Sequence, residues 1–216
     1  NHRYGLKDII ISMGTIILLT HMKYQLQTKK KIIFYLYNMK ELIEYSNILE
    51  SDLFQLVDST SKKLLDSADS KIWNTWSEQI RDWSKPVNII DVPSDLEEKV
   101  YDDLKLNHLH MGGDVFVPTN MMFYYWLPGS YIPWHRDSSH EAGMTLYLNN
   151  NWLIKYGGLF NYYKKNSIRG IKPKKNLGVL QVGGIGHSTT IISSTAPIRR
   201  TLQIFFAKTN EEESII

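Results

Sequence analysis

The chain has 216 residues, which is enough for one well-buried domain and too few for two of ordinary size. Hydrophobic residues make up 43% of it and charged residues 22%, proportions that exclude a disordered chain. The net charge is +3, and the basic residues are scattered apart from the short runs 29–31 and 172–175, so we expect no nucleic-acid partner. Cysteine is absent, which excludes disulfides and thiolate chemistry and leaves nitrogen and oxygen ligands for any metal.

Residues 1–38 contain two short apolar runs, 9–11 and 32–37, and neither alternates cleanly between apolar and polar positions. We interpret this segment as an N-terminal extension or as additional strands of a core sheet. The longest apolar stretch of the chain, 9–20, is much shorter than the roughly 20 residues of a membrane-spanning helix. No signal-peptide cleavage pattern follows a charged start, so we expect a soluble, cytoplasmic protein without a membrane partner.

Helical periodicity dominates residues 39–113, which we predict to be a helical support region. One apolar stripe runs through 53–65. A second consists of four residues spaced by three, four and three positions, namely Trp73, Trp76, Ile80 and Trp83. Ser94 and Glu97 form a capping-box pattern at the start of a further helix. Such stripes are typical of helices that pack against a sheet.

Residues 114–216 contain short apolar segments, many of them aromatic, separated by Pro and Gly turns. We predict strands near 115–118, 121–126, 144–149, 158–163, 168–171, 177–182, 188–193 and 200–206. Short strands this closely spaced indicate a mainly β fold with some α, a double-stranded β-helix (jelly roll) braced by the N-terminal helices. In this interpretation, residues 114–216 form the core of a single domain.

The segment that carries the clearest chemistry contains the motif His135-x-Asp137. Residues i and i+2 of an extended strand point to the same face, so these side chains can bind one metal ion together. A third ligand has to come from elsewhere, and His187 directly precedes the predicted strand 188–193. Two imidazoles and one carboxylate leave three positions open on a six-coordinate ion, as in the facial triad of non-haem Fe(II) oxygenases. We therefore predict these three residues as metal ligands and catalytic residues.

An oxygenase of this type also has to bind an anionic cosubstrate, and a planar guanidinium can bind a carboxylate through two hydrogen bonds. Arg199 begins the last predicted strand, and alternation places Thr201 on the same face. We predict that these two side chains bind one carboxylate together. Arg200 would point to the opposite face and is the alternative cation.

The order of these motifs resembles the prolyl-4-hydroxylase-like branch of the Fe(II)- and 2-oxoglutarate-dependent oxygenases, most closely the hypoxia-sensing prolyl hydroxylases. The resemblance covers about residues 115–207 and depends on H-x-D, Tyr147-Leu148-Asn149 with Trp152, Gly157-Gly158, His187 and R-x-T in that order. It implies that Tyr147 donates its phenol hydrogen to the distal carboxylate of 2-oxoglutarate. It also implies that Tyr131 and one of Tyr124 or Tyr125 line the same pocket, and we assign this place to Tyr125.

The resemblance further implies Fe(II), 2-oxoglutarate and O2 as cofactors, with ascorbate as the reductant. Decarboxylation of 2-oxoglutarate to succinate and CO2 would be coupled to hydroxylation of an unactivated C–H bond. Halogenases of this class have a small residue in place of the carboxylate, so Asp137 favours hydroxylation. The substrate is a protein or peptide side chain such as proline, or a free amino acid or other small metabolite. A non-catalytic jelly-roll metal-binding protein would lack the cosubstrate residues.

Overall fold

The computed structural model describes residues 42–67, 71–73, 87–107, 110–111, 114–137, 141–182 and 184–209. All of them belong to one compact unit, Lys40–Ile216. The predicted extension 1–38 lies outside the described residues, as do Trp76, Ile80 and Trp83 of the tryptophan stripe.

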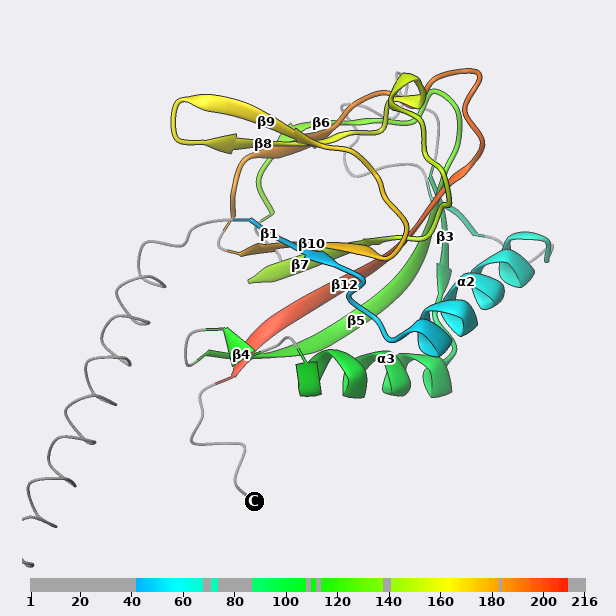
Figure 1. The fold of residues 1–216 in the computed structure, drawn as a ribbon, viewed down its shortest axis with the longest axis vertical. Coiled ribbons are helices and arrows are strands. Elements are labelled where there is room, and N and C mark those ends of the chain that lie inside the picture. The colour runs from blue at the N-terminus through cyan, green and yellow to red at the C-terminus, as the bar shows by residue number, and fades with distance from the viewer. Residues whose placement is uncertain are drawn as a thin grey trace, which may run out of the picture. The chain divides into compact units, whose positions relative to one another are not determined.

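Two antiparallel sheets face each other and form the predicted double-stranded β-helix (Figure 1). The larger sheet, in the order β1-β10-β7-β12-β5-β3-β2 with β4 beside β5, consists of β1 (Ile43–Ser46), β2 (Lys71–Trp73), β3 (Val87–Asp91), β4 (His110–Met111), β5 (Asp114–Trp126), β7 (Ala142–Tyr147), β10 (Leu177–Val182) and β12 (Arg199–Thr209). The smaller sheet, in the order β6-β11-β8-β9, consists of β6 (Ile132–His135), β8 (Phe160–Lys164), β9 (Ser167–Ile171) and β11 (His187–Thr189). A short 3-10 helix, η2 (Ile154–Tyr156), lies between β7 and β8.

Helices α2 (Ser51–Leu65) and α3 (Ser94–Asn107) cover the face of the larger sheet that points away from the smaller one (Figure 1). Their apolar sides join the main hydrophobic core, in which Val57 of α2 and Val100 of α3 are fully buried. The sheet contributes alternate residues of its central strands to this core, among them Phe123, Leu202, Ile204 and Phe206. In the described part of the chain, no helix is long and apolar enough to cross a membrane.

The prediction of a helical stripe beginning at Trp73 is wrong at that residue. Lys71–Trp73 is strand β2, which pairs with β3 so that Trp73 lies opposite Val87. Three further described strands, β1, β3 and β4, also fall in the region predicted to be a helical support. The pairing of β1 with β10 and of β3 with β5 is decided by partners distant in sequence, because the strand preference of a short segment depends on its neighbours in the sheet.

The predicted strands 115–118 and 121–126 form one continuous strand, β5. In its register with β12, Asn120 lies opposite Phe205 and Pro118 lies opposite Phe206. Thr119 is therefore the extra residue of a β-bulge, and its hydroxyl donates a hydrogen bond to the Phe205 carbonyl oxygen at 3.2 Å. The bulge allows the strand to continue past a proline.

An ion pair between Arg200 of β12 and Asp58 connects α2 to the larger sheet. The Arg200 Nη2 donates to Asp58 Oδ1 at 2.6 Å, and Lys62 donates to Oδ2 at 2.7 Å. Burial raises the pKa of the Asp58 carboxyl, but its hydrogen bonds to Lys62 and Arg200 and the charges of these residues outweigh burial and lower the pKa. The ionised carboxylate is thus favoured by the folded state.

Replacing Asp58 with asparagine should lower the free energy of unfolding by about 2 kcal/mol at pH 7, because charge-assisted hydrogen bonds are lost. The folded state lowers the pKa of Asp58 below its ordinary value of about 4. The stabilisation by the ionised carboxylate is therefore complete above pH 4, and it is lost as the pH falls through the lowered pKa. Urea unfolding of both proteins at a series of pH values measures the difference. The exposed Asp95, 3.9 Å from Lys99, is the control, since Asp95→Asn should change stability little. A difference that grows below pH 4 would contradict the assignment.

Candidate functional site

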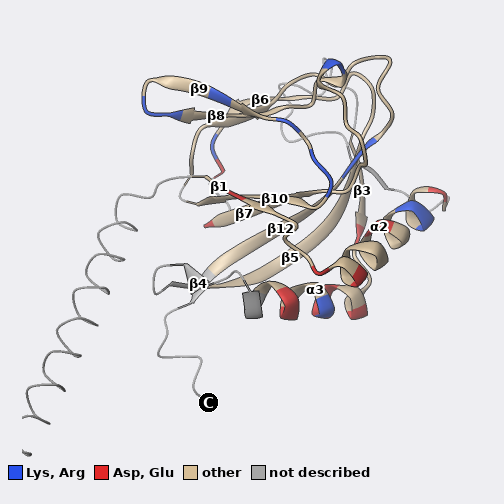
Figure 2. Ribbon diagram, viewed as in Figure 1, with Lys and Arg blue, Asp and Glu red and all other residues tan. Residues whose placement is uncertain are grey.

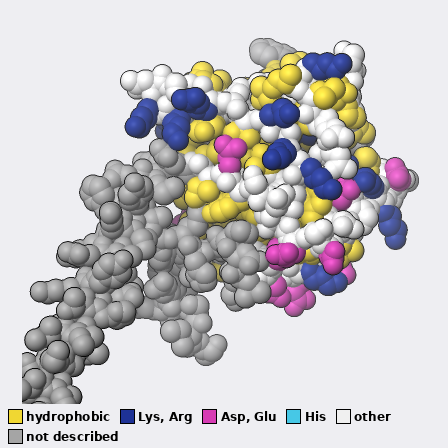
Figure 3. Space-filling model, in the orientation of Figure 1, with side chains coloured by type: hydrophobic (Ala, Val, Ile, Leu, Met, Phe, Trp, Pro, Cys, Tyr) yellow, Lys and Arg dark blue, Asp and Glu magenta, His cyan; other side chains and the backbone are white. Residues whose placement is uncertain are grey.

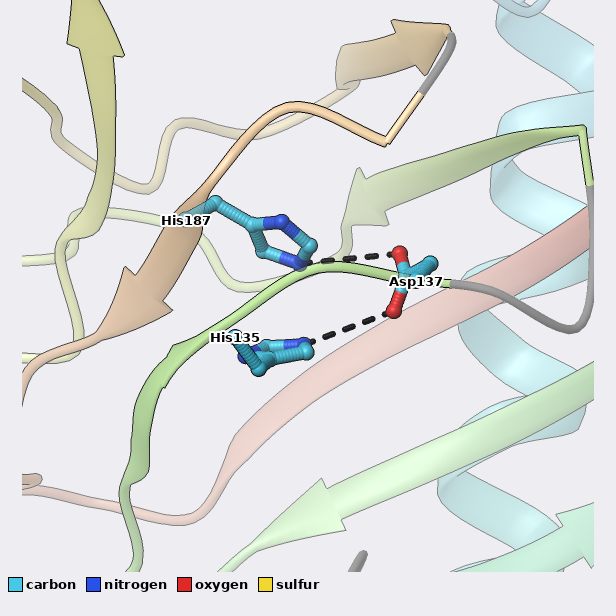
Figure 4. A group of neighbouring side chains, drawn as sticks. All are labelled: His135, Asp137 and His187. Carbon is cyan, nitrogen blue, oxygen red and sulfur yellow. Dashed lines mark ion pairs between the residues drawn. The ribbon is translucent and has the colours of Figure 1, made fainter.

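The predicted ligands His135, Asp137 and His187 come together between the two sheets (Figure 4). His135 ends β6 and pairs directly with His187, the first residue of β11. The His135 Nε2 lies 3.4 Å from Asp137 Oδ1, and the His187 Nε2 lies 3.6 Å from Asp137 Oδ2. One ligand atom from each residue lies within 4.8 Å of the others. This is a nitrogen, oxygen and nitrogen set that can bind one metal ion.

Both histidines are oriented so that Nε2 can serve as the metal-binding nitrogen. The Nδ1 of His135 lies 2.9 Å from the Pro133 carbonyl oxygen, and the Nδ1 of His187 lies 2.9 Å from the Ile185 carbonyl oxygen. A carbonyl only accepts, so each Nδ1 carries a hydrogen, and Nε2, which faces Asp137, is the nitrogen placed to bind a metal. The Phe160 ring stacks on His187 with 5.1 Å between ring centroids. The geometry therefore fits a divalent ion with octahedral preference and open positions.

Gln181 of β10 is a site residue that sequence reasoning missed. Its side-chain amide donates a hydrogen bond to Asp137 Oδ2. The signal in the sequence is a glutamine within an otherwise apolar strand, Leu177–Val182. A partner of this kind orients the carboxylate for the metal.

Gln181→Met keeps the size of the side chain and removes this donor. We expect the variant to bind divalent metal about ten-fold more weakly, because losing the partner of a ligating carboxylate typically has an effect of this size. Titration of the metal-free protein with Mn(II), followed by electron paramagnetic resonance, measures the affinity. Gln203→Met is the matched control, since the Gln203 amide contacts Thr145 and Thr201. Equal losses in both variants would show that Gln181 does not act through Asp137.

Arg199 is the cation that the structure places beside the metal site. It is 1% exposed and lines the same pocket as the three ligand residues. Its Nη1 donates to the Gly158 carbonyl oxygen at 2.6 Å, and its guanidinium carbon lies 4.3 Å from the centroid of the Trp126 ring. Arg200, the alternative cation, points to the helix-covered face and binds Asp58.

Arg199 has no acidic partner in the described part of the chain. Among the described residues, no carboxylate lies within ion-pair distance of it, and neither its Nε nor the Tyr147 hydroxyl has a hydrogen-bond partner. Burial lowers the pKa of Arg199 to about 10 and raises that of Tyr147 to about 12, so both groups keep their hydrogens at neutral pH. Buried donors without acceptors are costly. Arg199 lines the pocket, whereas Tyr147, whose ring centroid lies 5.5 Å from the guanidinium carbon, does not, so a carboxylate in the pocket would supply acceptors to Arg199 directly.

Thr201 lies two residues beyond Arg199, on the same face of β12. Its hydroxyl oxygen accepts a hydrogen bond from the Trp126 indole at 3.1 Å, which leaves the hydroxyl hydrogen available for an anion. Trp126 therefore both orients Thr201 and stacks against Arg199. Sequence reasoning gave Trp126 no role, although alternation along β5 places it on the same face as Tyr124.

The assignment of Tyr125 to the cosubstrate pocket is wrong in this fold. Its hydroxyl donates to the Ser61 carbonyl oxygen of α2 at 2.9 Å, on the helix-covered face of the larger sheet. The alternative, Tyr124, lies on the inner face, where burial and the charge of Asp137 raise its pKa to about 12. Tyr131 directly precedes β6, is half-buried and does not line the pocket.

Gly158 allows the backbone to approach Arg199 closely. It has a φ of +65°, and a Cβ atom there would lie 3.0 Å from the Arg199 Nη1 and closer still to Ile192. An alanine would be strained by the backbone conformation and would also displace the guanidinium. The Gly157-Gly158 pair thus lets the backbone lie directly against the side chains of Arg199 and Ile192.

One pocket connects the ligand triad with the cationic group. The residues lining it come from both sheets and comprise Trp126, Ile132, His135, Asp137, Gly143, Thr145, Phe160, Gln181, His187, Thr189, Arg199, Gln203 and Phe205. The three ligand residues and Arg199 therefore face one cavity.

No protein-family model matches this chain, and no curated protein is significantly similar to it in sequence. Solved structures do match. A prolyl hydroxylase from Trichoplax adhaerens, in complex with a peptide fragment of the hypoxia inducible factor oxygen degradation domain, has a TM-score of 0.63 at 16% identity, covering 85% of this chain and 92% of that one. A prolyl-4-hydroxylase from Pseudomonas putida has a TM-score of 0.62 at 14% identity, with coverages of 83% and 98%.

A third solved structure, the non-heme alpha ketoglutarate dependent epimerase SnoN from nogalamycin biosynthesis, has a TM-score of 0.59 at 8% identity, with coverages of 84% and 83%. Two of these proteins are prolyl hydroxylases and the third is an epimerase, and all three share one architecture with this chain. The chain therefore has the fold of the prolyl hydroxylases and other 2-oxoglutarate- and iron-dependent oxygenases, the fold that the order of its motifs predicted.

Proposed function

We propose that this protein is an Fe(II)- and 2-oxoglutarate-dependent dioxygenase that hydroxylates an unactivated C–H bond. One observation carries the proposal: the His135, Asp137 and His187 triad shares a pocket with Arg199, a buried cation that has no carboxylate partner among the described residues. A protein that only bound metal would have no reason to bury such a cation next to the metal site, because burying a charge without a partner is costly. The fold supports the same class of activity.

The residues divide into two groups by what they would hold. The triad would hold iron. Arg199, Thr201 and Tyr147 would bind the distal carboxylate of 2-oxoglutarate, with Trp126 orienting two of them. When bound, iron and 2-oxoglutarate supply the activation of O2 and the oxidising power for hydroxylation. The protein fixes the positions of the reactants and keeps bulk water away from the buried cation.

For the substrate, we propose a prolyl or similar side chain of a protein or peptide. The structural likeness with the two prolyl hydroxylases supports this choice, since one of them was solved with a peptide bound. The alternative is a free amino acid or other small metabolite, and it is favoured by the likeness with SnoN, an epimerase of nogalamycin biosynthesis.

The experiment that tests the function measures succinate formed from 2-oxoglutarate by the protein with Fe(II), ascorbate and O2. Proline-containing peptides and free amino acids are offered in parallel, and mass spectrometry detects the addition of one oxygen atom to the substrate. We expect turnover that depends on iron and stops with a chelator. Stimulation by peptides identifies the proposed substrate class, and stimulation by amino acids alone identifies the alternative. Failure to bind 2-oxoglutarate in the presence of metal would overturn the proposed function.

A further inference from the structure

Basic and acidic residues separate across the described fold. From Ala142 to Thr209 the sequence contains no Asp or Glu, and this stretch forms every strand of the smaller sheet except β6. Acidic residues concentrate on α2 and α3, whereas Lys and Arg mark the β8–β9 hairpin and the loops beside it (Figure 2). The smaller sheet thus presents a positive surface on the side of the molecule away from the helices.

The smaller sheet also exposes a row of large apolar side chains, one on each of three strands. Trp134 of β6, Tyr163 of β8 and Ile168 of β9 are 39%, 52% and 57% exposed. Trp134 stacks on Tyr163 with 4.4 Å between ring centroids, and Tyr163 lies directly opposite Ile168 in the hairpin. Basic side chains gather over this hairpin, at the upper left of Figure 3, with hydrophobic ones beside them. Contiguous exposed apolar side chains of this kind mark binding surfaces.

β9 is the edge strand of the smaller sheet, and among the described residues it pairs with β8 alone. The Tyr163 N–H donates to the Gly186 carbonyl oxygen at 3.2 Å, on the side of β8 away from β9. Tyr163 and Ile168 are therefore a pair that exchanges no backbone hydrogen bonds, so the N–H and C=O of Ile168 point to the open edge. Because a strand repeats every two residues, the N–H and C=O of Gly170 also point to the open edge.

We infer that β9 and the apolar row form a docking site for an extended acidic peptide segment, which adds to the smaller sheet as a further strand. Backbone hydrogen bonds to the edge would give affinity, as in other cases of strand addition. Carboxylates on the peptide would face Lys165 and Arg169, which are exposed on the hairpin. Its apolar side chains would contact Ile168. The inference does not depend on the proposed oxygenase activity.

A peptide fits this surface better than single-stranded nucleic acid does. The open edge offers backbone donors and acceptors in the spacing of another strand. Base stacking needs free aromatic faces, and the stack between Trp134 and Tyr163 already occupies one face of each ring.

Fluorescence anisotropy with the full, metal-free chain tests the inference. The probe is a fluorescein-labelled peptide of alternating glutamate and valine, compared with its lysine–valine analogue and with an oligothymidylate of equal charge. We expect the acidic peptide to bind, the lysine peptide not to bind, and the oligothymidylate to bind more weakly. Arg169→Glu should weaken binding of the acidic peptide about ten-fold, since it replaces an attraction with a repulsion. Lys155→Glu is the control, because it makes the same change of charge at an exposed residue of η2, outside the smaller sheet.

Two N-methylated versions of the acidic peptide test the strand pairing without altering the protein. In each, every second backbone nitrogen is methylated, so that one version blocks the donors facing β9 and the other blocks those facing solvent. We expect one version to lose binding and the other to retain it. Three results would each overturn the inference: both versions bind like the parent peptide, Arg169→Glu and Lys155→Glu weaken binding equally, or the oligothymidylate binds more tightly than the peptide.

Discussion

Arg199→Lys is expected to weaken binding of 2-oxoglutarate about a hundred-fold. The variant keeps a positive charge but loses the planar pair of donors, and two charge-assisted hydrogen bonds together contribute about 3 kcal/mol. It also leaves the Gly158 carbonyl oxygen without its 2.6 Å partner. Calorimetric titration of 2-oxoglutarate into Mn(II)-loaded protein measures the affinity in the absence of turnover.

The neighbouring residue provides a matched control for this experiment. Arg200→Lys makes the same chemical change one position along β12, but its side chain points to α2 and contacts Asp58. We expect it to lower the free energy of unfolding and to leave the affinity for 2-oxoglutarate within about two-fold. If Arg200→Lys weakened 2-oxoglutarate binding and Arg199→Lys did not, the roles assigned to the two arginines would be reversed.

His187→Ala is expected to abolish iron binding at micromolar metal and to reduce succinate formation on the order of a thousand-fold. The two remaining ligands come from one short segment and cannot define a face of the coordination sphere. Metal content after dialysis and the rate of succinate formation report the two effects separately. Ser188→Ala, at the next residue of β11, should retain the metal. If His187→Ala still bound one equivalent of iron, His187 would not be a metal ligand.

The parts of the fold that were predictable from sequence depend on local patterns. Short strands with turn residues between them led to the double-stranded β-helix, and the spacing of His135 and Asp137 led to the paired ligands. Strands β1, β2 and β3 were not predicted, because their pairing is set by segments far away in the chain. A short apolar segment can join a helix or a sheet, and only its partners decide which.

The choice between Tyr124 and Tyr125 illustrates the same limit at the level of one residue. Alternation showed that the two point to opposite faces of a strand, but not which face lines the pocket. The register of β5 with β12 decides it, because Thr201 lies opposite Tyr124 and Arg200 lies opposite Tyr125. The contact between Gln181 of β10 and Asp137, which follows β6, likewise joins residues far apart in the chain, and no local pattern contains it.

Each histidine of the triad is oriented by a carbonyl only two residues earlier in its own chain segment, at Pro133 and Ile185. The imidazoles therefore need no ion to take up their ligating orientation, and little rearrangement accompanies loading. We expect the two histidines to keep this orientation in the metal-free form, so that metal binding requires little refolding around them.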